Sequence, residues 1–241
     1  MYSDDKLQVG SLTVRLEQDQ DASSPREDDN VGMMTCFHRR YTLGDEHSHE
    51  SNSAFLFSLA SEHYADLEDL LDNRMYSRMV TASYDQPEYK TQRKAWDEAR
   101  DAFIWKAIDK HYVILPLGLY DHSGISMYVG SQPSPFDPGG WDSGQVGWIY
   151  VSAEKARKEF GRKWRKRAEE CLRAEVKVYD DFITGNVWGF VVEGADGECV
   201  DSCWGFVGDV EYAFAEGKSS AEYYLANEAK QEQEVRDTFA L

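Results

Sequence analysis

Alternation of apolar and polar residues marks the strands that the sequence predicts. Three apolar residues between residues 11 and 17 alternate with polar ones, and this period of two is typical of a strand that buries one face. Apolar runs predict three more strands, at residues 33–38, 112–120 and 146–151. Because Pro116 lacks a backbone N–H, it indicates that its strand lies at a sheet edge or carries a bulge.

Apolar residues at helical spacing predict four amphipathic helices, at residues 54–72, about 91–110, about 152–183 and about 219–238. Ser53 is the expected N-cap of the first helix, and Thr184 with Gly185 is expected to end the third. The expected buried faces contain Trp96, Ala99, Phe103 and Ala107 in the second helix, and Tyr223 and Ala226 in the last.

A tetrapeptide repeat gives the most specific local prediction. The sequence Trp-Gly-Phe-Val occurs twice, on either side of an Asp-Gly dipeptide at residues 196–197, and this dipeptide is favoured in two-residue type I′ hairpin turns. Closing a hairpin there places Trp188 opposite Gly205 and Trp204 opposite Gly189. Each indole is then expected to cover a residue that has no side chain.

The order of these elements predicts the fold class. Strands and helices interleave without a regular strand–helix–strand alternation, which favours an α+β fold with a largely antiparallel sheet. The sheet is expected to include the hairpin of the C-terminal half and to be packed by three to four amphipathic helices. No long linker rich in Ser, Gly or Pro divides the chain. We expect one domain over residues 1–241, or two closely packed lobes that meet near residues 111–140.

Composition shows a globular and strongly acidic chain. The 241 residues are 41% hydrophobic, which provides material for a core and excludes disorder throughout. Forty-four Asp and Glu against 26 Lys and Arg give a formal net charge of −18, with the acid excess mainly at the two chain ends. Because this charge repels phosphates and anionic membranes, we do not expect direct binding to nucleic acid or to a membrane.

The cysteines and the apolar runs bear on location in the cell. Four scattered cysteines do not make a disulfide scaffold. No apolar run approaches the roughly 20 residues that span a bilayer, and the first residues lack the features of a signal peptide. We therefore expect a cytoplasmic protein with reduced thiols.

Three segments combine Asp with hydroxyl residues, two of them ending in Gly: Asp121-His122-Ser123-Gly124, Asp142-Ser143-Gly144 and Asp201-Ser202-Cys203. Turn capping is the favoured interpretation, because Asp and Ser bond to the local backbone and Gly adopts positive φ. The alternative is a metal-assisted hydrolase or nucleotide-modifying enzyme. In that alternative Asp121, Asp142 and Asp201 would hold a divalent cation and His122 would act as acid or base.

For two further clusters of polar residues, we favour a structural role over a binding site. His47-Ser48-His49-Glu50 contains the ligand types for a metal, but one flexible pair of histidines without distant partners is more typical of a polar loop. The basic stretch, residues 155–167, holds eight Lys and Arg. These bases point around most of a helix, which favours a solvated face over a phosphate-binding stripe.

Several sequence blocks are distinctive enough to suggest a family. They are Pro25-Arg26-Glu27 with Asp29-Asn30, Cys36-Phe37-His38-Arg39-Arg40-Tyr41 with Leu43-Gly44-Asp45, Leu119-Tyr120-Asp121-His122-Ser123-Gly124, Trp141-Asp142-Ser143-Gly144-Gln145-Val146-Gly147 and Asp201-Ser202-Cys203-Trp204-Gly205-Phe206. These blocks resemble an uncharacterised family of phage, prophage and plasmid accessory proteins. Asp28 stands where a Trp is usual in that family, which makes this loop more acidic. The resemblance implies a mobile-element context and assigns no catalytic residue.

Acidity and the resemblance together favour a binding protein over an enzyme. Host defence machinery that handles nucleic acid, such as restriction enzymes and CRISPR effector complexes, has basic channels that attract a rigid acidic surface. We expect an anti-restriction or anti-CRISPR inhibitor that competes with nucleic acid in the host cytoplasm and needs no cofactor; acidity that only aids solubility is the plain alternative. The expected contact residues are Glu27, Asp28, Asp29, Asp45 and Glu46, and in the last helix Glu222, Glu228, Glu232 and Glu234.

Overall fold

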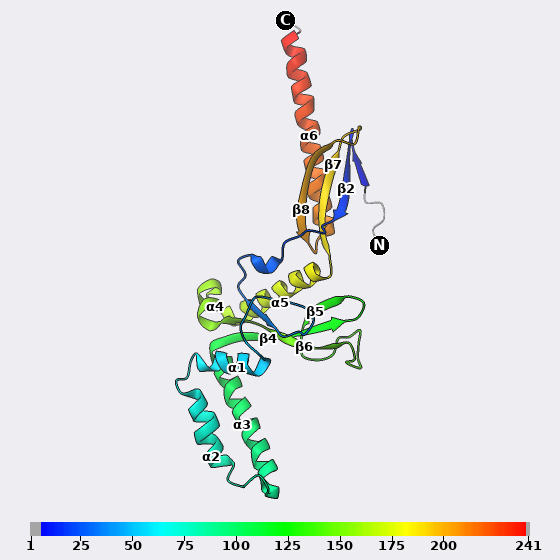
Figure 1. Cartoon of the computed structure of the whole chain (residues 1–241). Helices are drawn as coiled ribbons and strands as arrows, with labels where there is room; N and C mark the ends of the chain where they lie inside the picture. Colours follow the sequence, from blue (N-terminus) through cyan, green and yellow to red (C-terminus); the bar gives the residue numbers. More distant parts are fainter. Residues whose placement is uncertain (1–5, 240–241) are drawn as a thin grey trace. The chain divides into compact units, whose positions relative to one another are not determined.

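The computed structural model describes residues 6–239 and confirms the α+β class, with two four-stranded antiparallel sheets (Figure 1). The chain divides into two compact units, which we describe separately. The first unit comprises residues 1–29, 121–127 and 177–241, and the second comprises residues 30–120 and 128–176.

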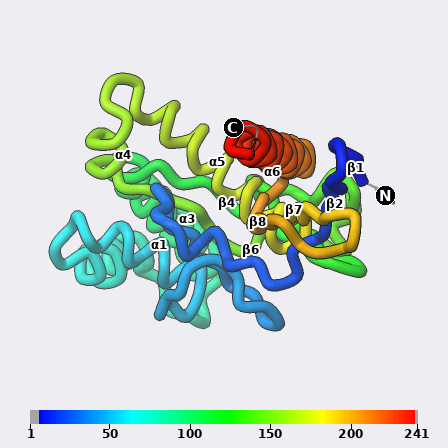
Figure 2. Tube along the Cα trace, turned by 90° about the horizontal axis from the view of Figure 1, so that it is seen from above, coloured from blue at the N-terminus to red at the C-terminus, as the bar shows by residue number. Residues whose placement is uncertain are grey.

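The first unit is a sheet covered on one face by a long helix. Its strand order is β1-β2-β7-β8, with the strands β1 (Lys6–Val9), β2 (Leu12–Gln18), β7 (Val187–Glu193) and β8 (Cys199–Val207). The helix α6 (Val210–Phe239) packs along β2, β7 and β8 (Figure 1), and Figure 2 shows it nearly end-on beside these strands. Leu12, Val14, Phe190 and Val192 form the core between sheet and helix.

Small residues on α6 decide which side of the helix meets the sheet. Ala213, Gly217 and Ala221 are its buried residues, and a Cβ at position 217 would lie 2.7 Å from a methyl carbon of Val14 in the sheet. The prediction that Tyr223 and Ala226 face inward is wrong, because both are exposed. At about 100° per residue they lie about 200° and about 140° around the helix from Ala221.

The predicted hairpin forms, but half of its predicted pairing is wrong. Trp204 covers Gly189 as expected, because a Cβ on Gly189 would lie 2.6 Å from Cδ2 of that indole. Trp188, however, pairs with Phe206 and not with Gly205. Gly205 has a φ of +86° and takes up the extra residue of a bulge, which shifts the register by one. The tetrapeptide repeat could not show this bulge.

The hairpin turn also differs from the predicted type I′. The Gly197 N–H donates to the Gly194 carbonyl at 3.0 Å, and the Gly194 N–H donates to the Glu198 carbonyl at 2.9 Å. Gly197 has a φ of +80°, whereas Asp196 is not among the residues with positive φ. The connection is therefore a longer turn that ends in a glycine bulge, which is a common alternative for hairpins.

The second sheet lies mainly in the second unit and has the order β3-β6-β4-β5. Its strands are β3 (Met33–Cys36), β4 (Tyr112–Asp121), β5 (Ile125–Val129) and β6 (Ser143–Ser152). Pro116 lies in β4, an interior strand, so of the two predicted alternatives the sheet edge is wrong and the bulge agrees with the structure. A register shift between Leu117 and Gly118 lies directly after it.

The helices of the second unit are α1 (Asn52–Ser61), η2 (Asp69–Met75), α2 (Tyr76–Met79), α3 (Pro87–His111), α4 (Ala153–Phe160) and the first part of α5 (Trp164–Ile183). Of these, α1, η2 and α3 share a core that includes Phe55, Leu59, Leu71, Ile104 and Ile108. A short turn of helix, η1 (Pro25–Glu27), belongs to the first unit. In α3, Trp96 and Ala107 are buried as predicted, and Ala99 and Phe103 are half-buried.

Two of the predicted helices are interrupted. The helix expected over 54–72 stops at Ser61, and the chain turns at Asp66, which has a φ of +57°; Asp tolerates this conformation better than most residues. Its N-cap is Ser51 and not Ser53. The helix expected from Ser152 breaks between α4 and α5, where two residues have positive φ.

Candidate functional site

The excess negative charge is concentrated in one unit. Counted from the sequence, the ranges of the first unit contain 23 Asp and Glu against 7 Lys and Arg, a net charge of −16. The ranges of the second unit contain 21 against 19, a net charge of −2. The first unit is therefore a strongly acidic module, although the two units carry nearly equal numbers of acids.

Strand pairing explains why acids from both chain ends belong to the same unit. β2 pairs with β7 from Thr13 opposite Glu193 to Gln18 opposite Trp188. The N-terminal strands thus complete the sheet that carries the C-terminal helix. The sequence shows the acid excess at the two ends, and this long-range pairing brings the two ends together.

The N-terminal residues that we predict to contact a partner lie at and after η1. Ser24 caps this turn by accepting a hydrogen bond from the Arg26 N–H at 3.2 Å. Glu27, Asp28 and Asp29 follow and are exposed. Exposure leaves these side chains at the protein surface, as the prediction requires.

The C-terminal residues that we predict to contact a partner lie on the exposed sides of α6. All four are exposed: Glu222, Glu228, Glu232 and Glu234. Two of them have a cation one turn away on the same helix, with Glu222 3.7 Å from Lys218 and Glu232 3.4 Å from Arg236. Such exposed pairs are weak and compete poorly with an external cationic surface. From residue 228 to residue 239 every residue of α6 is exposed, and this part extends past the strands (Figure 1).

Asp45 and Glu46 belong to the second unit. The Asp45 carboxylate accepts a hydrogen bond from the Met34 N–H at 2.7 Å, and the Asp45 N–H donates to the Met34 carbonyl at the same distance. Asp45 therefore holds β3 in place, which is a structural role. Glu46 is exposed.

The alternative cation site is not assembled. Across residues 6–239 no three His, Cys, Asp or Glu side chains form a group that could hold a metal ion. Asp201 lies within β8, not in a turn, and Oδ2 of its carboxylate accepts a hydrogen bond from the Ser220 hydroxyl of α6. Asp142 is the last residue of a loop of the second unit, whereas Asp121 and His122 belong to the first unit. The described side chains thus give the hydrolase alternative no metal-binding group.

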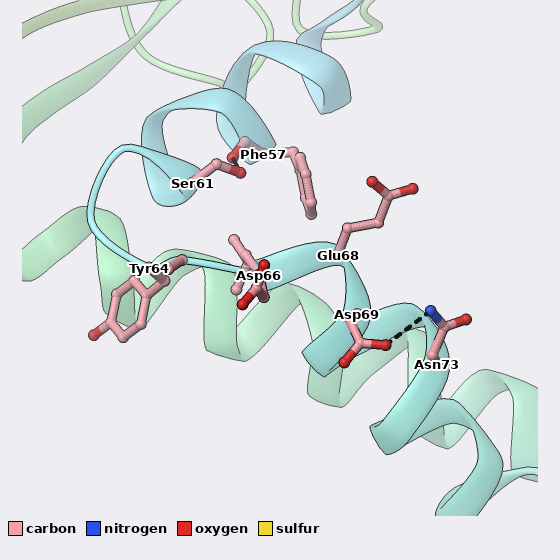
Figure 3. Close-up of a pocket in the computed structure, with 9 residues that line it drawn as sticks. Phe57, Ser61, Tyr64, Asp66, Glu68, Asp69 and Asn73 are labelled. Atoms are coloured by element: carbon pink, nitrogen blue, oxygen red, sulfur yellow. Dashed lines mark hydrogen bonds between the residues drawn. The ribbon is translucent and has the colours of Figure 1, made fainter.

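An acidic hollow in the second unit was not predicted (Figure 3). It measures about 480 Å³ and is lined by residues of α1, of η2 and of the segment that connects them, among them Phe57, Asp66, Glu68 and Asp69. Asp69 accepts a hydrogen bond from Asn73 at 3.1 Å. Five acids and no Lys or Arg occur between residues 62 and 72, and this run was the available signal. Nearby cations partly neutralise it, as in the 2.6 Å ion pair between Arg74 and Asp69.

Histidines and a tyrosine form a stacked cluster at the start of β4. The rings of His63 and His111 are nearly parallel, with centroids 3.8 Å apart. The Tyr112 hydroxyl donates to Glu62 at 2.5 Å and lies 3.1 Å from Nε2 of His63. Loss of solvent, and then the charge of His63, lowers the pKa of His111; burial, and then the bond to Glu62, raises the pKa of Tyr112. These contacts join the end of α1 to β4.

The other polar clusters of the sequence have structural partners. Nε2 of His47 lies 2.8 Å from the Cys36 carbonyl oxygen, and the His47 ring packs against Phe37. In the basic stretch, Arg165 donates to the Asp109 carbonyl at 2.9 Å, near the end of α3. Other bases of the stretch also bond to backbone carbonyls. Such contacts favour a structural role over phosphate binding.

Comparisons with protein-family models, curated proteins and solved structures find no match to this chain. Among the described residues, none of the helices is both long and apolar enough to span a bilayer. A function therefore has to be inferred from the charge and geometry of the chain itself.

Proposed function

We propose that the protein binds a nucleic-acid-handling partner and occupies its basic channel with the acidic first unit. The observation that carries this proposal is the charge of −16 on the first unit against −2 on the second. If the acids served only solubility, we would expect the negative charge to be spread over both units and not concentrated in one.

Electrostatics explains how such a unit selects its partner. A channel that binds phosphates has a positive potential, and low-dielectric walls focus that potential on its mouth. An acidic module is drawn to the channel and then excludes nucleic acid from it. The exposed carboxylates of α6 are carried on a helix, so their backbone positions are held at fixed spacing and the backbone loses little conformational freedom on binding.

The resemblance to mobile-element proteins narrows the class of partner. We propose that the partner belongs to host defence machinery, either a restriction enzyme or a CRISPR effector complex, and that binding takes place in the host cytoplasm. In this function the protein inhibits by competition and carries out no chemical reaction.

Salt dependence tests the electrostatic part of this proposal. The chain should be titrated against purified restriction enzymes and CRISPR effector complexes, and the Kd measured as NaCl rises from about 50 to about 200 mM. Because several ion contacts form together, we expect affinity to fall about tenfold or more over this range. Tight binding that does not change with salt would contradict the proposal.

A further inference from the structure

The loop between β5 and β6, residues 130–142, is exposed yet held by many hydrogen bonds. The Tyr128 hydroxyl donates to the Gln132 carbonyl at 2.8 Å. Ser134 is buried, and its N–H donates to the Ser143 hydroxyl at 3.1 Å. Its carbonyl accepts from the Asp137 N–H at 2.9 Å. This loop therefore has a defined conformation before any partner binds.

Asp137 is the central acceptor of the loop. Oδ2 of its carboxylate accepts from the Asp142 N–H and from the Ser143 hydroxyl, both at 2.8 Å. Partial burial opposes its ionisation, but these bonds and those from nearby backbone amides hold its pKa below the usual range. The charged carboxylate thus joins Asp137, the residue after Phe136, to Asp142, the residue after Trp141.

Phe136 and Trp141 are presented to solvent by this ordered loop. Their exposed fractions are 85% and 90%, and among the large apolar side chains that the structure describes only Tyr84 at 86% and Phe239 at 85% are similarly exposed. The Trp141 indole lies against Gly139, where a Cβ would be 2.6 Å from its Cδ1. Preorganised aromatic side chains of this kind are typical of binding hot spots, because they bury much area at a small cost in entropy.

The negative charge of the loop favours a cationic partner. Residues 112–152 contain no Lys or Arg, and the loop itself contains two carboxylates, Asp137 and Asp142. An indole face attracts cations, and Arg is the side chain most often found on it. An anionic lipid surface or a nucleic acid would instead be repelled by the carboxylates of this loop.

We propose that Phe136 and Trp141 are the aromatic anchor by which this chain docks on a basic protein surface, with an Arg side chain of the partner stacked on the Trp141 indole. This inference rests on the proposed function, since it adds a second contact to the same class of partner. The acidic unit provides long-range attraction, and the loop provides short-range specificity for Arg.

Cationic peptides test the anchor directly. Nona-arginine and nona-lysine should be titrated into the full chain, with affinity measured by calorimetry and the indole N–H signals followed by NMR. We expect nona-arginine to shift the Trp141 signal, and Trp141→Ala to weaken its binding by about threefold to thirtyfold. The matched control is Tyr84→Ala, which removes an equally exposed ring of the second unit and should leave binding unchanged.

This experiment distinguishes failure of the aromatic anchor from failure of the proposed function. If Trp141→Ala binds nona-arginine as tightly as Tyr84→Ala does, while binding remains sensitive to salt, the anchor is wrong and the proposed function stands. If neither peptide binds at low salt, the electrostatic basis of the proposed function fails as well. If Trp141→Ala instead converts a dimer into a monomer in sedimentation, the loop joins two copies of this chain and the proposal is overturned.

Discussion

Replacing with lysine the four glutamates of α6 that we propose as contacts is expected to reduce affinity for the proposed basic partner by at least about tenfold. The variant carries Lys at positions 222, 228, 232 and 234, all of which are exposed. Exposed ion pairs contribute about 0.2–1 kcal/mol each. Each reversal removes an attraction and adds a repulsion, so four reversals together exceed the 1.4 kcal/mol that corresponds to a tenfold change.

A matched variant separates the position of the charge from its amount. Glu88, Asp97, Glu98 and Asp101 are exposed acids of α3 in the second unit. Asp97 and Glu98 have cations one turn away, as two of the α6 glutamates do. Either set of four substitutions changes the net charge from −18 to −10, because each replacement of an acid by lysine raises the charge by two. Equal losses of affinity in the two variants would show that only total charge matters.

The second large effect is expected on stability, from Gly147→Ala in the central strand β6. A Cβ at this position would collide with the Thr35 carbonyl oxygen and lie 2.8 Å from the Cα of Cys36. Both atoms belong to the backbone of β3, which pairs with β6 here. Since a backbone cannot rotate away as a side chain can, we expect a loss of about 3 kcal/mol in the free energy of unfolding.

The control for this prediction lies three residues earlier on the same strand. A Cβ on Gly144 would meet no atom within 4 Å, so Gly144→Ala should change the unfolding free energy little. Denaturant unfolding of both variants measures the difference. Equal midpoints would show that β3 does not approach β6 as closely as described.

Local patterns in the sequence predicted much of the fold. The alternation around Val14 and the apolar run before Ser152 mark real strands, and Gly185, with a φ of +74°, ends α5 as expected. The predictions that were wrong depended on the backbone conformation of individual residues. Asp66, Lys163 and Gly205 adopt positive φ, and neither helical periodicity nor a repeat reveals such positions.

The candidate site was predictable in composition but not in arrangement. Acids near Glu27 and Glu228 are visible in the sequence as an excess at the chain ends. Their membership of one unit depends on the pairing of β2 with β7, which are more than 160 residues apart. The exposure of Trp141 was equally hidden, because an aromatic residue in a sequence gives no sign of whether it packs inside or outside.

Competition between this protein and nucleic acid tests the central claim most directly. A purified CRISPR effector complex or restriction enzyme should be loaded with labelled DNA or RNA, and the chain added in increasing amounts. If the acidic unit occupies the basic channel, the labelled nucleic acid is displaced, and a higher concentration of the labelled nucleic acid restores its binding, as mutually exclusive binding requires. Formation of a ternary complex, with the protein and nucleic acid bound at the same time and at unchanged affinity, would contradict the account.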